Sequence, residues 1–377
     1  MLKQIIEKKE KKVEYVELIY DLIFVYIVGR NNSLLHNITN GFVNPASVFA
    51  YILCTLAVIQ IWNFSTYYIN IYGRHSVREH VFLFLNMFLL YFIGEATRIG
   101  WYEHHTMYHI AWILILLNVA AQYLFELRNH DNDANRRQIM RMAFVLISEA
   151  AVAGAAIFEY RFFGTSWLSL AAILYGMGFV LLFGQRNVAS FVDFSHLSER
   201  AMLYVVFTFG EMIIVVSGYF GETMTANSLY FASMAFLIVV GLFLSYGVFY
   251  DRIIDRDRNT NGLLYMLTHI FIIFFLNNIT NSLEFMRDEE VELMPKIIFL
   301  IASFIMYYVF LFALCGYSKN SLKPAFFLIP ALVSAVFAAV MFVFRENMYA
   351  NIAVSVVYAF VMFAIIFVNV KKQGVSQ

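Results

Sequence analysis

The sequence predicts an all-α protein that crosses a lipid membrane about twelve times, in two six-helix halves. Composition, the length of the apolar runs and the distribution of positive charge predict this class. Of the 377 residues, 61% are hydrophobic and only 14% are charged, whereas soluble proteins carry about 25% charged residues. With a mean hydropathy of +0.70, too few polar side chains remain to cover a surface in water. The lipid bilayer is therefore the first expected partner.

Apolar runs long enough to span a bilayer recur along the chain. A hydrocarbon core about 30 Å thick needs roughly 20 residues of helix. Twelve such runs lie near residues 17–36, 47–71, 79–97, 106–127, 138–159, 166–184, 198–220, 228–250, 262–285, 296–315, 325–344 and 349–370. The segments between them are too short for a water-soluble domain. Any function is therefore expected in or at the membrane.

Lysine and arginine residues divide unevenly between the two sets of loops that these runs create. One set, together with both chain termini, holds 20 of the 26 Lys and Arg residues. Loops rich in Lys and Arg stay in the cytoplasm. We therefore expect both termini on the cytoplasmic side of the membrane.

The two halves of the chain resemble each other at an offset near 182 residues. Many transporters consist of two related halves. The offset aligns polar residues of runs one to three with polar residues of runs seven to nine: Glu17 with Glu199, Arg30 with Glu211 after a one-residue slip, Asn70 with Asp251, and Glu95 with Asn277. Because six is an even number of spans, the halves 1–190 and 191–377 would share one orientation.

Several classes of activity lack their sequence signatures. Positive and negative charges balance, 26 against 26, so no basic surface for nucleic acid is expected. Cys54 and Cys315 stand alone in apolar runs, without the spacing of a metal site or a disulfide framework. No phosphate-binding loop, dinucleotide fingerprint or catalytic serine motif is present, so we expect no cofactor. The sequence leaves oligomerisation open.

Ionisable residues within the runs are the main site candidates, because each costs about 2.5–3.5 kcal/mol to insert. Arg30, Glu149 and Glu211 lie near mid-span, His269 lies nearer the cytoplasm and Glu95 lies nearer the outside. We prefer Glu211, which has no polar neighbour on its own helix and must be protonated or paired with a cation. Arg30 occupies the related position in the first half. We therefore expect Arg30 and Glu211 to meet; separate partners are the alternative.

The segment DFSHLSER carries Asp193, His196, Glu199 and Arg200 at the start of run seven. His196 and Glu199 are three residues apart and share a helix face, as metal-binding pairs do in helical bundles. Such a site needs further carboxylates on facing helices. Alternatively, Asp193 or Ser195 caps the helix and Glu199 pairs with Arg200 at the membrane surface. The second interpretation is favoured, so no metal site is predicted.

Glu17 and Asp21 are four residues apart, so both carboxylates face the same way about one turn inside the membrane. In one interpretation, the two carboxylates form a proton or cation site. The same carboxylates could also supply the further ligands that a metal site on His196 and Glu199 would need. The other interpretation is a set of salt bridges to Arg200 or Arg78. The spacing is compatible with both.

Two further runs carry unusual polar residues. The polar residues of run nine would either line a water-filled path or hold helices together. The polar and aromatic residues of run two form a rim near the membrane surface. Run nine contains His269, Asn277, Asn278, Thr280 and Asn281. The rim contains Trp62, Asn63 and Asn70, and Asp251 takes the related position in the second half.

Two segments together form a pattern that is specific enough to indicate a protein family. The first, VELIYDLIFVYIV, contains Glu17, Asp21, Phe24 and Val25, and the second, HLSERAMLYVVFTFGEMII, contains His196, Glu199, Arg200, Gly210 and Glu211. They resemble the ELFFDLVFVFAL-like and HxxERFGLxxIxxLGES-like patterns of the bacterial low-temperature-requirement A family. The end of run two, from Trp62 to Asn70, is also similar. Phe209, Met212 and Arg30 depart from the family's usual residues.

The resemblance implies a multi-pass protein of the bacterial inner (cytoplasmic) membrane. It implies no activity, because the family is named for a growth phenotype. Three functional hypotheses therefore come from the residues.

The leading hypothesis is a secondary transporter or channel for a small solute or ion, coupled to protons through Glu211 together with Glu17, Asp21 and Glu199. The second is an intramembrane enzyme that acts on lipid with His196 as base. The third is a membrane sensor or assembly factor for growth in the cold, in which the buried charges are structural. An enzyme is the less favoured class.

Overall fold

The computed structural model describes residues 11–98, 100–183, 192–220, 224–286 and 288–372, and each of the twelve predicted runs lies on an α-helix within them. The helices are α1 (Tyr15–Asn31), α2 (Pro45–Tyr72), α3 (Val77–Arg98), α4 (His105–Glu126), α5 (Asp133–Phe163), α6 (Trp167–Phe183), α7 (Phe194–Ser217), α8 (Ala226–Val248), α9 (Leu263–Phe285), α10 (Leu293–Ala313), α11 (Ala325–Val343) and α12 (Met348–Lys372). A π-helical segment, Phe249–Ile253, continues α8, and a 3-10 segment, Leu314–Tyr317, continues α10. The predicted boundary at residue 190 lies outside the described residues, as do five of the counted cations: Lys3, Lys8, Lys9, Arg186 and Arg287.

Ten of the helices in the described parts of the chain are long and apolar enough to cross a membrane. The other two, α1 and α6, have 17 residues each. The all-α, multi-pass membrane class is therefore confirmed. That all twelve helices cross the bilayer stays a prediction.

Apolar side chains cover the outside of the bundle, as expected in lipid. On α3, Val81, Phe84, Phe88 and Tyr91 recur every three or four residues and are all more than half exposed. Many buried positions are instead polar. These buried polar residues distinguish the fold from a water-soluble helical bundle, whose interior is mostly apolar.

Side-chain caps begin several of the described helices, among them α2, α5, α7 and α8. The Oδ1 atom of Asn44 accepts from the backbone N–H of Ala46 at 2.9 Å, next to a proline at the first helical position of α2. At α7, the Oδ1 atom of Asp193 accepts from the backbone N–H of His196 at 3.3 Å. Of the two predicted caps of α7, Asp193 is therefore the correct one.

The predicted first run ends earlier than expected. The α-helix stops at Asn31 and continues as a 3-10 helix, η1 (Asn32–His36), followed by a hairpin of β1 (Ile38–Thr39) and β2 (Phe42–Val43). The two turn residues, Asn40 and Gly41, have φ values of 52° and 77°. An Asn-Gly pair with positive φ is the favoured hairpin turn, and it explains the hairpin that follows η1.

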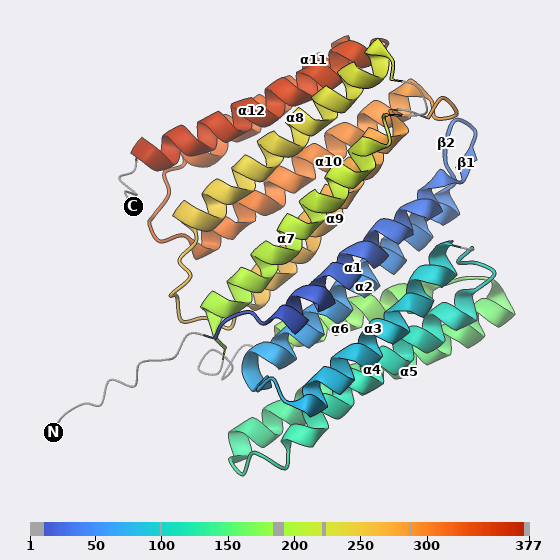
Figure 1. Cartoon of the computed structure of the whole chain (residues 1–377), viewed down its shortest axis with the longest axis vertical. Helices are drawn as coiled ribbons and strands as arrows, with labels where there is room; N and C mark the ends of the chain where they lie inside the picture. Colours follow the sequence, from blue (N-terminus) through green and yellow to red (C-terminus); the bar gives the residue numbers. More distant parts are fainter. Residues whose placement is uncertain (1–10, 99, 184–191, 221–223, 287, 373–377) are drawn as a thin grey trace.

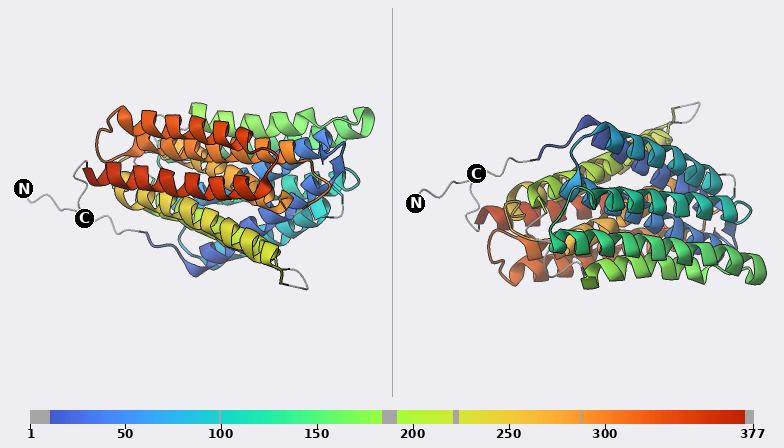
Figure 2. Two further views of the ribbon diagram at one scale, coloured as in Figure 1. Left: turned by 90° about the horizontal axis from the view of Figure 1, so that it is seen from above. Right: turned by 90° about the horizontal axis from the view of Figure 1, so that it is seen from below.

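Helices α1–α6 and α7–α12 form two groups that lie side by side (Figures 1 and 2). The groups meet where α1 packs against α7, α2 against α7 and α9, and α6 against α9. The start of α1 and the end of α12 lie toward one end of the bundle, and the β1–β2 hairpin lies at the other (Figure 1). We refer to these as the terminal end and the hairpin end; the cytoplasmic location of the terminal end stays a prediction.

Candidate functional site

A buried guanidinium joins the two groups of helices near the terminal end. Arg200 of α7 is fully buried and faces Glu17 and Asp21 of α1, which are also buried. Its Nη1 donates to Glu17 Oε2 at 2.7 Å, its Nε donates to Asp21 Oδ2 at 3.1 Å, and its Nη2 donates to Asp21 Oδ1. The planar guanidinium thus binds Asp21 at two points and Glu17 at a third. We call Glu17, Asp21, His196 and Arg200 the charge cluster.

Helix α2 completes the surroundings of Asp21. The indole Nε1 of Trp62 donates to Asp21 Oδ1 at 2.7 Å, so both carboxylate oxygens of Asp21 are hydrogen-bonded. The ring of Tyr204, one turn after Arg200 on α7, packs edge-on against Trp62 with centroids 4.6 Å apart. Three of the roughly four acceptor positions of the Asp21 carboxylate are therefore occupied.

Asn70 fixes the orientation of His196. The Asn70 Oδ1 accepts from the backbone N–H of Asp193 at 3.0 Å, and its Nδ2 donates to the backbone carbonyl of Asp193 at 2.8 Å. The same Nδ2 lies 3.0 Å from His196 Nδ1, which must therefore accept. The proton of the neutral imidazole is then on Nε2, which lies 3.3 Å from Glu17 Oε2 without hydrogen-bond alignment. His196 thus faces Glu17 as a neutral donor.

The charge cluster keeps one negative charge in excess. It holds two carboxylates and one guanidinium, and His196 is neutral in this tautomer. Glu17 Oε1 is buried and has no hydrogen-bond donor among the described residues. Lys11, a cation outside the cluster, binds the backbone carbonyls of Ile69 and Gly73. Burial lowers the pKa of Lys11, and Glu17 partly offsets this.

One prediction about this segment, the ion pair of Glu199 with Arg200, is wrong. Glu199 does not pair with Arg200 but lies half-buried outside the cluster, because Arg200 points toward α1. A metal site built on His196 and Glu199 is not formed either, since His196 faces Glu17 and Arg200 occupies the space between the carboxylates. In the described parts of the chain, no three His, Cys, Asp or Glu side chains are grouped as metal ligands. Of the two interpretations of Glu17 and Asp21, salt bridges to Arg200 describe the contacts.

A second polar group, which we call the amide cluster, lies on the hairpin side of the same helices. It consists of Asn31, Asn32, Tyr51, Asn277, Asn278 and Asn281. Asn32 Oδ1 accepts from Asn277 Nδ2 at 2.8 Å and from Asn281 Nδ2 at 3.0 Å. The hydroxyl of Tyr51 donates to Asn278 Oδ1 at 2.6 Å. The polar line of run nine therefore holds α9 to η1 and α2.

Several buried polar atoms along this contact have no hydrogen-bond partner among the described residues. They are Glu17 Oε1, Asn31 Oδ1, Thr66 Oγ1, Tyr204 OH and Asn281 Oδ1. Buried polar atoms without partners are rare and need an explanation. Together with the charge cluster and the amide cluster, these atoms mark the contact between the two groups as the candidate functional site.

Glu211 and Arg30 lie on neighbouring helices but do not form the predicted ion pair. The Nε of Arg30 donates to Tyr26 OH at 2.8 Å, and its guanidinium lies 5.1 Å from that ring's centroid. The half-buried carboxylate of Glu211 packs against Gly29, where a Cβ atom would lie 2.6 Å from Oε1. The prediction failed because Tyr26, one turn before Arg30, offers a partner on the same helix.

The remaining candidates lie apart from both clusters. Glu149 of α5 is buried beside Gln60, whose Nε2 lies 3.5 Å from Oε2, while Oε1 has no partner among the described residues. His269 Nε2 lies 3.0 Å from Tyr246 OH, within the second group.

At the surface, Glu95 pairs with Arg98 at 2.6 Å, and Asp251 is exposed. Asn63, which follows Trp62 on α2, has a buried Oδ1 without a partner among the described residues. These positions do not extend either cluster.

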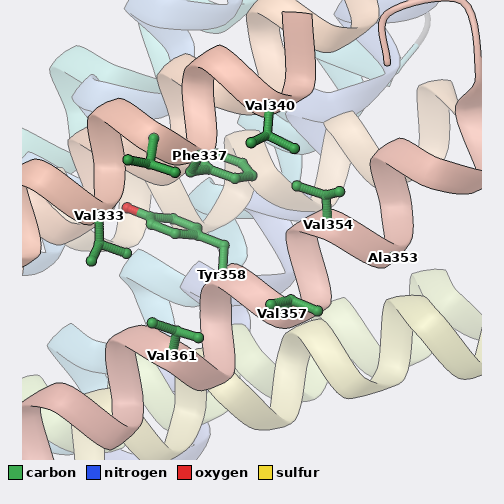
Figure 3. A pocket seen from close by; sticks show the side chains of 9 residues that line it. Val333, Phe337, Val340, Ala353, Val354, Val357, Tyr358 and Val361 are labelled. Atoms are coloured by element: carbon green, nitrogen blue, oxygen red, sulfur yellow. The ribbon is translucent and has the colours of Figure 1, made fainter. Parts of the chain in front are cut away.

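An apolar groove of about 450 Å³ lies elsewhere, between α11 and α12. Valines line it, and Tyr358 stacks on Phe337 with ring centroids 4.0 Å apart (Figure 3). Val336 and Val357 are each more than 60% exposed, so the groove opens toward lipid. It contains no residue of α1, α2, α7 or α9 and takes no part in the candidate site.

Sequence patterns missed part of this site. Tyr204 lies four residues after Arg200 and could have been found by helix periodicity. Asn32 and Tyr51 belong to different elements, and only the fold brings them to run nine. The loop residue His75, whose Nε2 lies 3.9 Å from Glu17 Oε1, has no sequence signal at all.

The fold and the polar contact define a multi-pass helical membrane protein with charged groups buried between two groups of helices. The chain matches the family described as bacterial low temperature requirement A protein (LtrA) over residues 12–367, and it belongs to this family. No curated protein and no solved structure matches it. The predicted family is thus confirmed over nearly the whole chain.

Proposed function

We propose that this protein carries a small solute or ion across the membrane, coupled to protons, along the contact between α1 and α7. The observation that carries the proposal is the layering on one face of α1. Buried carboxylates at Glu17 and Asp21 come first, apolar Phe24 and Val28 follow, and the amide cluster begins at Asn31. Asp21 and Asn31 are ten residues apart, about 15 Å along a helix.

Two polar clusters with an apolar layer between them match the needs of alternating access. A permeating solute requires polar groups at each end of its path, and a layer without polar groups prevents a continuous leak. This arrangement corresponds to a closed state in which neither end is open. Motion of α7 relative to α1 would open one cluster at a time.

The excess negative charge gives a reason for proton coupling. A proton on Glu17 Oε1, the oxygen without a donor, would neutralise the charge cluster. It would also weaken the hold of Glu17 on Arg200, which links α1 to α7. Proton binding and the helix contact are then coupled through the same carboxylate.

The helix contacts support two halves of the same orientation. In the first group, α1 packs against α2 and α3, α3 against α4, and α2 against α6. In the second group, α7 packs against α8 and α9, α9 against α10, and α8 against α12. The same neighbours recur at an offset of six helices, as expected of a duplicated transporter whose equivalent helices α1 and α7 meet at the centre.

The geometry favours transport over the enzyme hypothesis. A base must have a free ring nitrogen that reaches the substrate's proton. In His196, Nδ1 accepts from Asn70 and Nε2 faces Glu17. Neither nitrogen is available to abstract a proton.

Proton flux into proteoliposomes with an internal pH-sensitive dye tests the proposal. We expect wild-type flux above that of empty liposomes, and we expect Glu17→Gln to remove it by eliminating the titrating carboxylate. Glu199→Gln is the matched control, because Glu199 lies at the same end of the bundle outside the cluster. Wild-type flux equal to that of empty liposomes would overturn proton coupling and favour the sensor or assembly factor.

A further inference from the structure

The short loop between α2 and α3, residues 73–76, is held in place from two sides. On the α3 side, Glu79 Oε2 accepts from the backbone N–H groups of Arg74 at 2.8 Å and Ser76 at 3.4 Å. Ser76 Oγ in turn accepts from the backbone N–H of Glu79 at 3.4 Å. This reciprocal pair is a capping box, which fixes the first turn of α3 and the end of the loop.

On the α2 side, Lys11 holds the other end of the loop. Its Nζ donates to Gly73 O at 3.0 Å and to Ile69 O. Its backbone N–H donates to Asp193 Oδ2 at 3.3 Å, so the same residue also reaches the start of α7. The loop therefore has a defined position over the terminal end of the charge cluster.

His75, between these two anchors, adopts a backbone conformation that few residues accept. Its φ is +53°, in the left-handed region where glycine is the usual residue. Left-handed non-glycine residues persist only where surrounding structure enforces them, and they concentrate at functional sites. The two anchors supply that enforcement here.

The conformation places the imidazole between water and the charge cluster. His75 Nε2 lies 3.9 Å from Glu17 Oε1, the buried oxygen that has no hydrogen-bond donor among the described residues. The His75 side chain is 31% exposed, whereas that of Glu17 is 2% exposed. A single water or a small movement of the ring would complete a hydrogen bond between them.

We propose that His75 is the proton relay between the aqueous phase at the terminal end and Glu17; this rests on the proposed function. The imidazole takes a proton from water and becomes an imidazolium. It then donates the Nε2 proton to Glu17 Oε1 and returns to the neutral form. The charged neighbours of the relay are Glu17 itself and, around the loop, Lys11, Arg74 and Glu79.

Two substitutions separate a relay from a residue that only shapes the loop. His75→Gly removes the imidazole and accepts the left-handed conformation without strain, so we expect a thermal unfolding midpoint at or above that of wild type. His75→Asn also tolerates this conformation but has no titrating group. If His75 relays protons, both variants lower proton flux by about a hundredfold, the size expected for a positioned proton-transfer group.

Addition of free imidazole to proteoliposomes that contain His75→Gly completes the experiment. We expect imidazole to restore flux in His75→Gly, where the side chain's space is vacant, and to change wild-type flux little. His80→Asn, which alters another histidine at this end, should keep wild-type flux.

The outcomes distinguish the two proposals. Wild-type flux with unchanged flux in both His75 variants would overturn the relay and leave the proposed function standing. Lowered flux that imidazole fails to restore, together with a lowered unfolding midpoint, would also overturn it in favour of a structural role. Wild-type flux equal to that of empty liposomes would overturn both.

Discussion

Arg200 is a full positive charge with no access to water. The transfer of this charge from water into the protein costs free energy, and only the attraction of Glu17 and Asp21 offsets that cost. Burial of the two carboxylates costs desolvation free energy as well. Each member therefore depends on the others, although 179 residues separate Asp21 from Arg200. The spacing of Glu17 and Asp21 was compatible with salt bridges to Arg200 but could not select them. Replacement of one member leaves the others as unpaired buried charges.

Arg200→Met should lower the free energy of unfolding by about 3–5 kcal/mol, because two carboxylates stay buried without a cation. Chemical denaturation of the purified protein in detergent measures this change. Arg74→Met, which removes an exposed arginine from the same end, is the control and should change stability by less than about 0.5 kcal/mol.

The triple variant Glu17→Gln, Asp21→Asn, Arg200→Met should be more stable than Arg200→Met alone, since it removes the unpaired charges together. Additive losses across the three positions would contradict the description of the cluster as one interdependent unit.

At the scale of elements, close helix contacts depend on small residues. A Cβ atom at Gly241 of α8 would lie 2.8 Å from the Cβ of Ala359 on α12 and 3.2 Å from that residue's backbone carbonyl carbon. Backbone cannot swing away as a flexible side chain can. Small residues at such crossings are the usual means by which membrane helices approach closely.

Gly241→Ala should therefore destabilise the protein by about 1–3 kcal/mol, because α12 must move away from α8. Gly247→Ala on the same helix meets no atom within 4 Å and serves as the control. It should be neutral or stabilising by up to about 1 kcal/mol, since alanine favours a helix more than glycine does. Equal effects at the two positions, measured by thermal unfolding, would show that close packing of α8 on α12 is not the cause.

At the scale of the whole molecule, the two groups of helices are also joined at the hairpin end. The backbone N–H of Glu292 donates to Gly41 O at 2.7 Å, and the ring of Phe42 packs against Phe285. His36 Nε2 lies 3.5 Å from Glu284 Oε2 on α9. The two groups thus contact each other at both ends, through the charge cluster at one and through η1 and the hairpin at the other.

The contact of His36 with Glu284 should make stability depend on pH. The hydrogen bond with Glu284 raises the pKa of His36 above its ordinary value, although partial burial opposes this and Asp288 adds to it. Because the pKa of His36 is higher in the folded state than in the unfolded state, protonated His36 contributes its full stabilisation below the unfolded-state pKa of about 6.5. That stabilisation is lost as the pH rises through the folded-state pKa.

Wild type should consequently exceed His36→Gln in unfolding temperature at mildly acidic pH and match it at alkaline pH. The half-exposed pair limits the difference in free energy to less than about 1 kcal/mol. A difference that grows toward alkaline pH would contradict the assigned ion pair.

Most of the helices and most of the residues of the two clusters were predictable. Long apolar runs determine where helices lie, because a backbone in lipid must satisfy its own hydrogen bonds. Glu17, Asp21, His196 and Arg200 stood out because ionisable residues inside apolar runs are rare. The pairing of Glu211 with Arg30 was wrong, and Tyr51 and His75 were missed, because partners on different elements leave no periodicity in one sequence.

The sequence by itself determined the membrane class, the helix positions, the family and the charged residues at the start of runs one and seven. Each of these depends on composition or on spacing within a single helix. Only the tertiary structure decided that Arg200 binds both carboxylates of α1, that the asparagines of α9 bind η1 and that His75 lies over Glu17. Those contacts depend on how helices that are far apart in the chain pack against one another, and the spacing of residues within a single helix does not specify that packing.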